Sequence, residues 1–406
     1  MFARTKELKL SVIKQMELRA AKIPDVISLA QGVPSFDTPE FIKRRVEKEL
    51  KNPVVSKYSL SPGMPALREL FEVHLSKENM FYDWETEILV TVGAIEALTA
   101  TILTITQPGD EILIPEPAYT SYREVVTLAG CKPVYAPLNE ENDWSLEMHE
   151  IEKAITPKTK AIIYSNPSNP TGTIFSKAQL LELVEFVKKH NIYLITDELY
   201  KDFVFDPSYL ENGRLFSVAE IPEIRDKVIR IFSLSKLFAM TGWRVGFLHS
   251  DVKLVKEILK VHDCMVTCAP VISQVAAMGA LEGCEENITN FNVEFQKRRD
   301  LICDRLDKLP EYFSYARPQG AYYIFPKIKT EAFPNMKKAI NSKGVEVIDS
   351  WEFCVNLLEK AEVGTVPGFA FGPSGEGHFR MNFAKSEEDI NKAFDRIEKY
   401  CAEFGC

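Results

Sequence analysis

The sequence predicts an α/β protein in which a largely parallel sheet, flanked by helices, is joined to a smaller α+β domain. Through the middle of the chain, apolar segments of strand length alternate with amphipathic segments of helix length, the pattern of βαβ units. The apolar segments are rich in β-branched residues and lack a polar face, as expected for strands buried on both sides. After about residue 285 this alternation stops, which indicates a second domain.

The first elements are a helix near Leu10–Ala21 and the turn-rich stretch Ala30–Pro34, which has no strand partners of its own and can pack on either domain. Short apolar runs then predict the strands of the large sheet: Ile88–Val92, Glu111–Ile114, Ala161–Ser165, Tyr193–Thr196, Val228–Ser233 and Val245–His249. Helices are predicted at Ala94–Leu103, which Pro108-Gly109 closes, and at Lys177–His190, where apolar residues recur at helical spacing.

The last part of the chain has a different pattern. A long charged helix is predicted at Asn290–Arg305 and a strand at Ala321–Ile328, followed by amphipathic helices at Met336–Ser342 and Glu387–Glu403 on either side of a Gly/Pro-rich loop, Val363–Gly377. The expected division is therefore a large domain of residues 46–285 and a small domain made of 1–45 and 286–406.

Composition narrows the function classes. The chain has 406 residues, 46% hydrophobic and 26% charged, the balance of a globular protein. Its net charge of −9 has the wrong sign for a general nucleic-acid or anionic-membrane binder, so we expect a small-molecule partner. The N-terminus is charged, and no long apolar run follows, which predicts a cytoplasmic protein without a membrane span. The 8 cysteines form no C-x-x-C and the 6 histidines show no ligand spacing, so neither a disulfide framework nor a metal site is expected.

The carboxyl ends of parallel strands are where α/β proteins bind ligands, and four of the predicted strand ends carry unusual residues. After Ile88–Val92, the residues Gly93, Ala94 and Ile95 form a turn of small residues that enters a helix. Free N–H groups and the helix dipole at such a start suit a phosphate. Taken alone, however, this is more simply a tight connection, because no glycine-rich phosphate motif surrounds it.

Two further strand ends present polar side chains from rigid or buried positions. The loop Asn166–Gly172 contains two Asn-Pro pairs, which fix the backbone and direct the amide of Asn169. A plain turn-rich loop is the simpler alternative, but the repeated Asn-Pro followed by Thr-Gly is more specific than that. Asp197 and Tyr200 follow the strand Tyr193–Thr196, where a buried carboxylate needs a cation or a hydrogen-bond donor.

The fourth strand end carries a candidate nucleophile. Lys236 lies among apolar and hydroxyl neighbours, including Ser233 and Ser235, where desolvation lowers the pKa of a lysine. Arg244, eight residues later, offers a planar fork for a phosphate. A lone lysine is usually a solvated surface charge. The functional interpretation of Lys236 is favoured only because the other three strand ends also carry unusual residues. Ser233–Lys236 also matches the Ser-x-x-Lys of serine acyl-transfer enzymes, but the companion motifs Ser-Asp-Asn and Lys-Thr-Gly are absent from the sequence.

In this order, the four strand ends resemble those of fold-type-I pyridoxal-phosphate enzymes, specifically class I/II aminotransferases of the aspartate/aromatic branch. The resemblance runs from Leu29–Pro34 to Phe379–Asn382. It implies an aspartate-aminotransferase-like fold with a mostly parallel sheet of the seven-stranded type, the cofactor pyridoxal 5'-phosphate, amino-acid and 2-oxo-acid substrates, and a homodimer with shared active sites.

The resemblance also implies roles for single residues. Lys236 would form the Schiff base with the cofactor and later shuttle a proton, and Asp197 would pair with the pyridine nitrogen. Tyr200 and Asn169 would hydrogen-bond the phenolic oxygen of the cofactor, while Tyr119 would stack on its ring.

The phosphate and the substrate would be held by a further set of residues. The phosphate would contact the backbone at Gly93, Ala94 and Ile95, the side chains of Ser233, Ser235 and Arg244, and Tyr58 of the neighbouring subunit. Arg380 would bind the substrate α-carboxylate with two hydrogen bonds, beside Gly32 and Asn169. An exposed strand-end arginine is the simpler alternative for Arg380, but its apolar surroundings favour the carboxylate clamp.

Two departures from the family pattern bear on specificity. Some relatives that prefer aspartate have a lysine at the position of Ile95, and an apolar residue there leaves a distal carboxylate unpaired unless another cation arrives from the N-terminal segment or the partner subunit. We therefore expect aromatic or bulky neutral substrates, with aspartate as the alternative. Tyr122 stands where some relatives place a histidine behind the pyridine-pairing aspartate.

Other function classes remain open to this sequence. A pyridoxal-phosphate-dependent β-lyase begins from the same stabilised carbanion, and residues around the cofactor do not distinguish it from an aminotransferase. A cofactor-sensing regulator would need an attached DNA-binding module, which the acidic chain offers no sign of.

Overall fold

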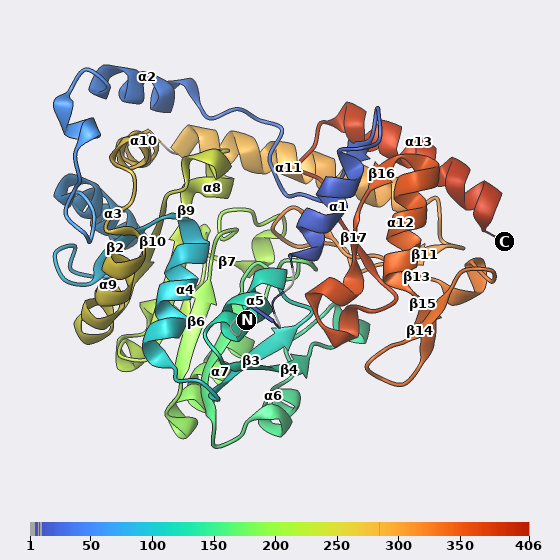
Figure 1. The fold of residues 1–406 in the computed structure, drawn as a ribbon, viewed down its shortest axis with the longest axis horizontal. Coiled ribbons are helices and arrows are strands. Elements are labelled where there is room, and N and C mark those ends of the chain that lie inside the picture. Colours follow the sequence, from blue (N-terminus) through green and yellow to red (C-terminus); the bar gives the residue numbers. More distant parts are fainter. Residues whose placement is uncertain (1–4, 7, 9, 284, 406) are drawn as a thin grey trace.

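The computed structural model describes residues 5–405 except 7, 9 and 284, and its centre is a seven-stranded sheet (Figure 1). Its strands lie in the order β2 (Ile88–Thr91), β10 (Gly246–His249), β9 (Val228–Ser233), β6 (Tyr193–Asp197), β5 (Thr159–Ser165), β3 (Glu111–Glu116) and β4 (Lys132–Pro137). The pairs from β9 to β4 are parallel, and β10 runs antiparallel to both of its neighbours. The predicted mostly parallel α/β sheet is confirmed.

Two separate apolar cores cover the two faces of this sheet. Successive residues of a strand enter opposite cores: Leu89 packs with one cluster and Val90 with the other, and Ile163 and Ile162 divide in the same way. Because both faces are covered, the strand sequences are continuous apolar runs. The exception is β4, an edge strand that begins with an exposed lysine and contains two prolines, which explains why its pattern predicted no strand.

Helices flank the sheet and connect its strands: α2 (Glu40–Glu49), α3 (Pro65–Lys77), α4 (Gly93–Ile105), α5 (Thr120–Leu128), α6 (Met148–Ala154), α7 (Lys177–His190), α8 (Leu234–Leu237), α9 (Val252–Val266) and α10 (Val271–Glu282). The predicted bounds of α7 are confirmed. Its start is fixed by a capping box in which Ser176 and Gln179 satisfy each other's backbone N–H groups, and it ends at Asn191 in the left-handed conformation. A two-stranded hairpin, β7 (Leu210–Glu211) with β8 (Arg214–Leu215), lies outside the large sheet.

The C-terminal part is built from short strands and three helices. The strands β12 (Tyr323–Ile324), β18 (Phe379–Asn382) and β17 (Val366–Pro367) form an antiparallel sheet, and β11 (Phe313–Ser314) pairs with β13 (Lys327–Ile328). The helices are α11 (Glu285–Leu306), α12 (Ser350–Ala361) and α13 (Glu387–Phe404). The helices predicted at Asn290–Arg305 and Glu387–Glu403 are thus confirmed.

Two predictions in this part were wrong. The predicted helix Met336–Ser342 is instead the strand β14 (Lys338–Ile340), which pairs with β15 (Glu346–Ile348). The turn between them is closed by the side chain of Asn341, which accepts from the backbone N–H groups of residues 343 and 345, and by Gly344 at φ +74°. The strand predicted over 321–328 is divided into β12 and β13, because the intervening Pro326 lacks a backbone N–H.

The N-terminal segment does have a strand partner, contrary to the prediction. Its strand β1 (Ile27–Ser28) pairs in parallel with β16 (Val363–Gly364), and α1 (Val12–Ala20) packs on β16 and β17. The segment therefore joins the C-terminal part. The division at residues 45/46 remains a prediction, and α2, which crosses it, packs on α10 of the large sheet's helical layer. Within the described residues no helix is both long and apolar enough to cross a bilayer.

Candidate active site

A cavity of about 560 Å³ opens at the carboxyl ends of β5, β6 and β9. It is bounded by the large sheet on one side and by β12, β18 and the N-terminal segment on the other. Eleven of the residues predicted for the site line it: Gly32, Ala94, Ile95, Tyr119, Asn169, Asp197, Tyr200, Ser235, Lys236, Arg244 and Arg380. Three others are not part of the lining, namely Gly93, Ser233 and Tyr58.

Lys236 lies in α8, the single helical turn that follows β9, and its amine points into the cavity. The Nζ atom donates a hydrogen bond to the carbonyl oxygen of Gly32 at 2.7 Å. Burial lowers the pKa of Lys236 to about 7, with help from the nearby guanidinium groups of Arg380 and Arg244, while Asp197 opposes the shift. A substantial fraction of this amine is therefore neutral near pH 7, the form that can act as a nucleophile or base.

Asp197 ends β6 and faces the same cavity. Burial raises its pKa to about 6, and hydrogen bonds from the Tyr122 hydroxyl and the Leu199 backbone N–H oppose the increase. The Tyr122 hydroxyl lies 2.7 Å from Oδ2 of Asp197. A tyrosine thus fills the place behind the aspartate that the sequence assigned to it. The other carboxylate oxygen, Oδ1, accepts from the Leu199 N–H at 3.4 Å and can accept from a second donor in the cavity.

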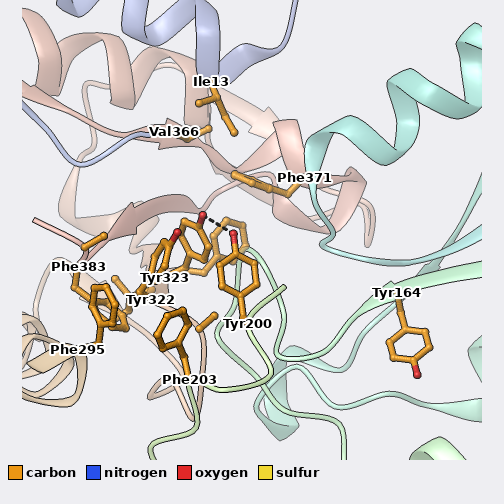
Figure 2. Close-up of a cluster of buried hydrophobic side chains, with 14 of the residues drawn as sticks. Ile13, Tyr164, Tyr200, Phe203, Phe295, Tyr322, Tyr323, Val366, Phe371 and Phe383 are labelled. Carbon is orange, nitrogen blue, oxygen red and sulfur yellow. Dashed lines mark hydrogen bonds between the residues drawn. The ribbon is translucent and has the colours of Figure 1, made fainter. Parts of the chain in front are cut away.

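Tyr200 belongs to a cluster of buried phenols (Figure 2). Its hydroxyl lies 2.9 Å from that of Tyr323, and the neighbouring Tyr322 donates to the carbonyl of Gly32 at 3.2 Å. Gly32 has no room for a side chain, since a Cβ atom there would lie 2.1 Å from the Tyr323 hydroxyl. The close approach of the N-terminal segment to this cluster places the Gly32 carbonyl against the Lys236 amine.

The start of α4 lies beside Arg244 at one corner of the cavity. The helix has no side-chain cap at its N-terminus, so the N–H groups of Ala94 and Ile95 remain directed at the cavity. Gly93 adopts φ +72°, and a Cβ atom on it would lie 2.5 Å from Nη2 of Arg244. Gly93 therefore serves the site by allowing Arg244 to reach the helix start.

The two serines before Lys236 differ in position. Ser235 lines the cavity, whereas Ser233 is fully buried and caps α8. The Ser233 hydroxyl lies 2.9 Å from the Val245 carbonyl and 2.8 Å from Oγ of Ser235. Its hydrogen-bonding capacity is used within the protein, so a direct contact of Ser233 with a bound phosphate is not part of this geometry.

Arg380 on β18 is only 1% exposed, yet it forms no ion pair with any residue that the structure describes. Its Nη1 donates to Oδ1 of Asn169 at 2.9 Å and its Nη2 to the Ala30 carbonyl, while Nε has no partner among the described residues. The guanidinium lies over the ring of Tyr323, 4.5 Å from its centroid. A buried cation without a counter-ion is costly, so this arrangement favours an anionic ligand.

Tyr119 directly precedes α5 and lines the cavity, with its ring edge-on to that of Tyr122 and the two ring centroids 5.5 Å apart. Asn169 is buried in the loop after β5, where it orients Arg380. Tyr58 lies outside the cavity of its own chain and is 84% exposed. Of the predicted site residues, Tyr58 lies away from the cavity, while Gly93 and Ser233 lie behind residues that line it.

The sequence analysis missed part of the lining. Tyr323 was predicted only as a strand residue, and Lys14, Ile13 and Leu98 were not singled out, although a cation from the N-terminal segment was left open. No local motif singled these residues out, because their side chains are brought to the cavity by packing between distant segments.

The arrangement suits transfer of an amino group: an amine with a pKa of about 7, a carboxylate in the same cavity, an uncapped helix start and a buried guanidinium that forms no ion pair with the described residues. The fold and this site define an aminotransferase-type enzyme. Comparison with known proteins then gives the family.

Residues 24–397 match the family described as aminotransferase class I and II, and the chain belongs to that family. It is 36% identical to an aspartate aminotransferase of Pyrococcus abyssi, covering 97% of this chain and 98% of the other. It is 35% identical, with the same coverage, to aromatic-amino-acid aminotransferase 2 of Thermococcus litoralis. Among solved structures, the aspartate aminotransferase of Rhizobium meliloti superposes with a TM-score of 0.89 at 30% identity, covering 100% of this chain and 99% of that one. Enzymes of this family use pyridoxal phosphate.

Proposed function

We propose that this aminotransferase uses pyridoxal 5'-phosphate to move an amino group between an aromatic or bulky neutral L-amino acid and a 2-oxo acid such as 2-oxoglutarate. The observation that carries the proposal is the Lys236 amine, with its pKa near 7, held in the same cavity as Asp197 and the unpaired guanidinium of Arg380.

The residues present fit the cofactor. The uncapped start of α4, with Arg244 and Ser235, provides donors for a phosphate, and Asp197 provides an anion for the pyridine nitrogen at the other side of the cavity. Tyr119 offers a ring face, and the Tyr200 hydroxyl offers a donor for the phenolic oxygen. When bound, pyridoxal phosphate supplies an electron sink for the negative charge that develops at the substrate α-carbon.

Each remaining step falls to a side chain of this chain. Arg380 binds the substrate α-carboxylate, using the donor capacity that Asn169 and the Ala30 carbonyl do not take. The Lys236 amine, once free, accepts the proton from the α-carbon and returns it, with the Gly32 carbonyl holding it in place between transfers.

The apolar part of the cavity lining supports a preference for substrates with a neutral side chain. Ile95, Leu98 and Ile13 contribute apolar surface to the lining, and Ile95 is 38% exposed before any ligand binds. Covering this surface with an aromatic side chain stabilises the complex by roughly 25 cal/mol for each Å² of apolar area removed from water.

We further infer a homodimer in which Tyr58 reaches the phosphate of the partner subunit. Tyr58 is a large, exposed side chain that does not reach its own cavity, and Leu50, Val54 and Leu60 near it are also exposed. A mixed-dimer experiment tests this. The Lys236→Ala dimer and the Tyr58→Ala dimer should each have impaired activity. Co-expression of the two variants should restore activity, because each mixed dimer contains one complete site. A purified mixed dimer that recovers no activity contradicts a shared site.

We also propose that the C-terminal part, with the N-terminal segment, moves as the small domain and closes over bound substrate. Arg380 is carried by the small antiparallel sheet and Lys236 by the large one, so closure changes the distance between the two groups that hold the substrate.

The test of the activity is a single-turnover spectrum of the cofactor-loaded enzyme with a panel of amino acids and no oxo acid. We expect phenylalanine, tyrosine and other neutral amino acids to convert the cofactor to its amino form. Conversion by aspartate and glutamate alone contradicts the neutral preference, and release of ammonia without conversion indicates the β-lyase instead.

A further inference from the structure

One charged side chain in the cavity has no role in the proposed reaction. The charged residues that line it are Lys14, Asp197, Lys236, Arg244 and Arg380. The last four serve the cofactor ring, the amine, the phosphate and the α-carboxylate. Lys14 is the fifth, and it comes from the N-terminal helix α1, outside the strand ends that carry the others.

The position of Lys14 is set by the element that also carries Arg380. Ile13, the residue before Lys14, is buried and points toward Val366 of β17 (Figure 2). In the small antiparallel sheet, Val366 is the register partner of Arg380 on β18. Lys14 and Arg380 are therefore carried by one packed unit, so the separation of their backbones is kept whether or not this unit moves relative to Lys236.

The Lys14 ammonium is free to take a ligand. It forms no ion pair and donates no side-chain hydrogen bond to any residue in the described part of the chain, and the side chain is exposed. Its charge nevertheless acts within the cavity, since it is among the cations that lower the pKa of Lys236. Ile13, Ile95 and Leu98 contribute apolar surface to the lining of the same cavity.

We propose that Lys14 binds the distal carboxylate of a dicarboxylic 2-oxo acid while Arg380 binds its α-carboxylate, so that one cavity accepts a neutral donor and an acidic acceptor in alternate half-reactions. This rests on the proposed function. With a bulky neutral side chain in place, the flexible lysine stem lets the ammonium turn to solvent, and the apolar wall is covered. With a dicarboxylate in place, the ammonium pairs with the second charge.

Lys14→Gln should affect the reaction of the acidic substrate and leave that of the neutral substrates nearly unchanged. In single-turnover experiments that start from the amino form of the cofactor, we expect the second-order rate constant for 2-oxoglutarate to fall about 10- to 100-fold, as for a lost charge-assisted hydrogen bond. The rate constant for phenylpyruvate, and that for phenylalanine from the aldehyde form, should change less than about twofold. Lys14→Arg should recover most of the loss. Lys22→Gln is the matched control, because Lys22 is exposed, lies just beyond the same helix and does not line the cavity. It should alter none of these three rate constants.

Equilibrium binding of unreactive acids provides a readout apart from turnover. By calorimetry on the cofactor-loaded enzyme, Lys14→Gln should weaken glutarate about tenfold or more and leave 3-phenylpropionate unchanged. Equal weakening of both acids assigns Lys14 a general structural role, and no weakening of glutarate shows that another cation holds the distal carboxylate; either result overturns the inference.

Failure of the proposed function is seen separately. If no amino acid converts the cofactor of the unsubstituted enzyme, the aminotransferase proposal fails before Lys14 is tested. If only acidic amino acids do so, the neutral preference fails, while the glutarate comparison still decides the role of Lys14.

Discussion

Burial has opposite consequences for the two ionisable groups that face each other in the cavity. Removal from water raises the pKa of the Asp197 carboxyl to about 6 and lowers that of the Lys236 amine to about 7. Both groups consequently titrate close to neutral pH. The Tyr122 hydroxyl counteracts the shift of Asp197, which keeps its carboxylate the main form at pH 7.

Lys236→Ala tests the central residue. We expect turnover to be abolished, because no other amine among the described cavity residues lies beside the Gly32 carbonyl, while the fold and assembly state are retained. Activity is measured by product formation, and folding by circular dichroism and sedimentation. Full activity in the variant contradicts the proposed mechanism.

The pH dependence of cofactor addition tests the lowered pKa of Lys236. Because the neutral amine reacts, the rate at which cofactor-free enzyme takes up pyridoxal phosphate should rise through about pH 7 and level off by about pH 8. An unshifted lysine would keep gaining rate toward pH 10. Arg380→Met removes a cation that lowers this pKa, so the midpoint should move to higher pH; an unchanged midpoint argues against the electrostatic cause.

At the scale of an element, the helix α4 is positioned by its first residue. Gly93 makes the turn from β2 possible at φ +72° and leaves space for Arg244 beside the free N–H groups. Gly246 on β10 contributes in the same way, since a Cβ atom on it would lie 3.0 Å from the Gly93 backbone. Two glycines thus allow a strand, a helix start and an arginine to approach one another at one corner of the cavity.

Gly93→Ala should therefore specifically weaken the binding of the cofactor. We expect the dissociation constant of pyridoxal phosphate to rise about tenfold or more, because the new methyl group displaces the Arg244 guanidinium, with a stability loss of about 1–2 kcal/mol from the positive φ. Gly109→Ala is the matched control: it has φ +94° but no atom within 4 Å of the new Cβ, so it should lose stability and keep its cofactor affinity. Equal effects of both variants on affinity would contradict the role of Arg244.

At the scale of the whole molecule, a buried carboxyl joins the large sheet to the C-terminal part. Glu116, at the end of β3, accepts a hydrogen bond from the Ser374 backbone N–H at 2.9 Å and contacts the Ser374 hydroxyl. Glu116 is 2% exposed, and burial raises its pKa from 4.5 to about 7. The Ser374 hydroxyl and backbone N–H both donate to the carboxyl and oppose this increase, but burial outweighs them.

Stability should consequently depend on pH through Glu116. A folded pKa above the unfolded value gives a contribution that is complete below about pH 4.5 and is lost as the pH rises through about 7, amounting to about 2–3 kcal/mol. Glu116→Gln imitates the protonated acid and should not show this loss. Urea unfolding of both proteins at pH 5 and pH 8 gives the comparison. A constant difference between the two proteins at both pH values contradicts the prediction.

Secondary structure was predictable where local pattern and tertiary setting agree. The strands around Ile163 and Leu89 are apolar on both faces because both faces are covered, and α7 carries its own start and stop signals. The hairpin of β14 and β15 was missed because its short strands carry no long alternation, and its turn depends on Asn341 and Gly344. The pairing of β1 with β16 joins residues more than 330 positions apart, which no local pattern encodes.

The sequence by itself determined the α/β fold, the family resemblance and the residues at the strand ends, among them Lys236, Asp197 and Asn169. It could do so because the chemistry of those positions requires particular residue types directly after apolar strands. Only the tertiary structure decided that Ser233 turns away from the cavity, that Tyr322 and Tyr323 enclose Gly32, and that Lys14 lines the same cavity as Ile95. These placements depend on packing between segments far apart in the chain, and the burial they create sets the pKa values on which the proposed chemistry depends.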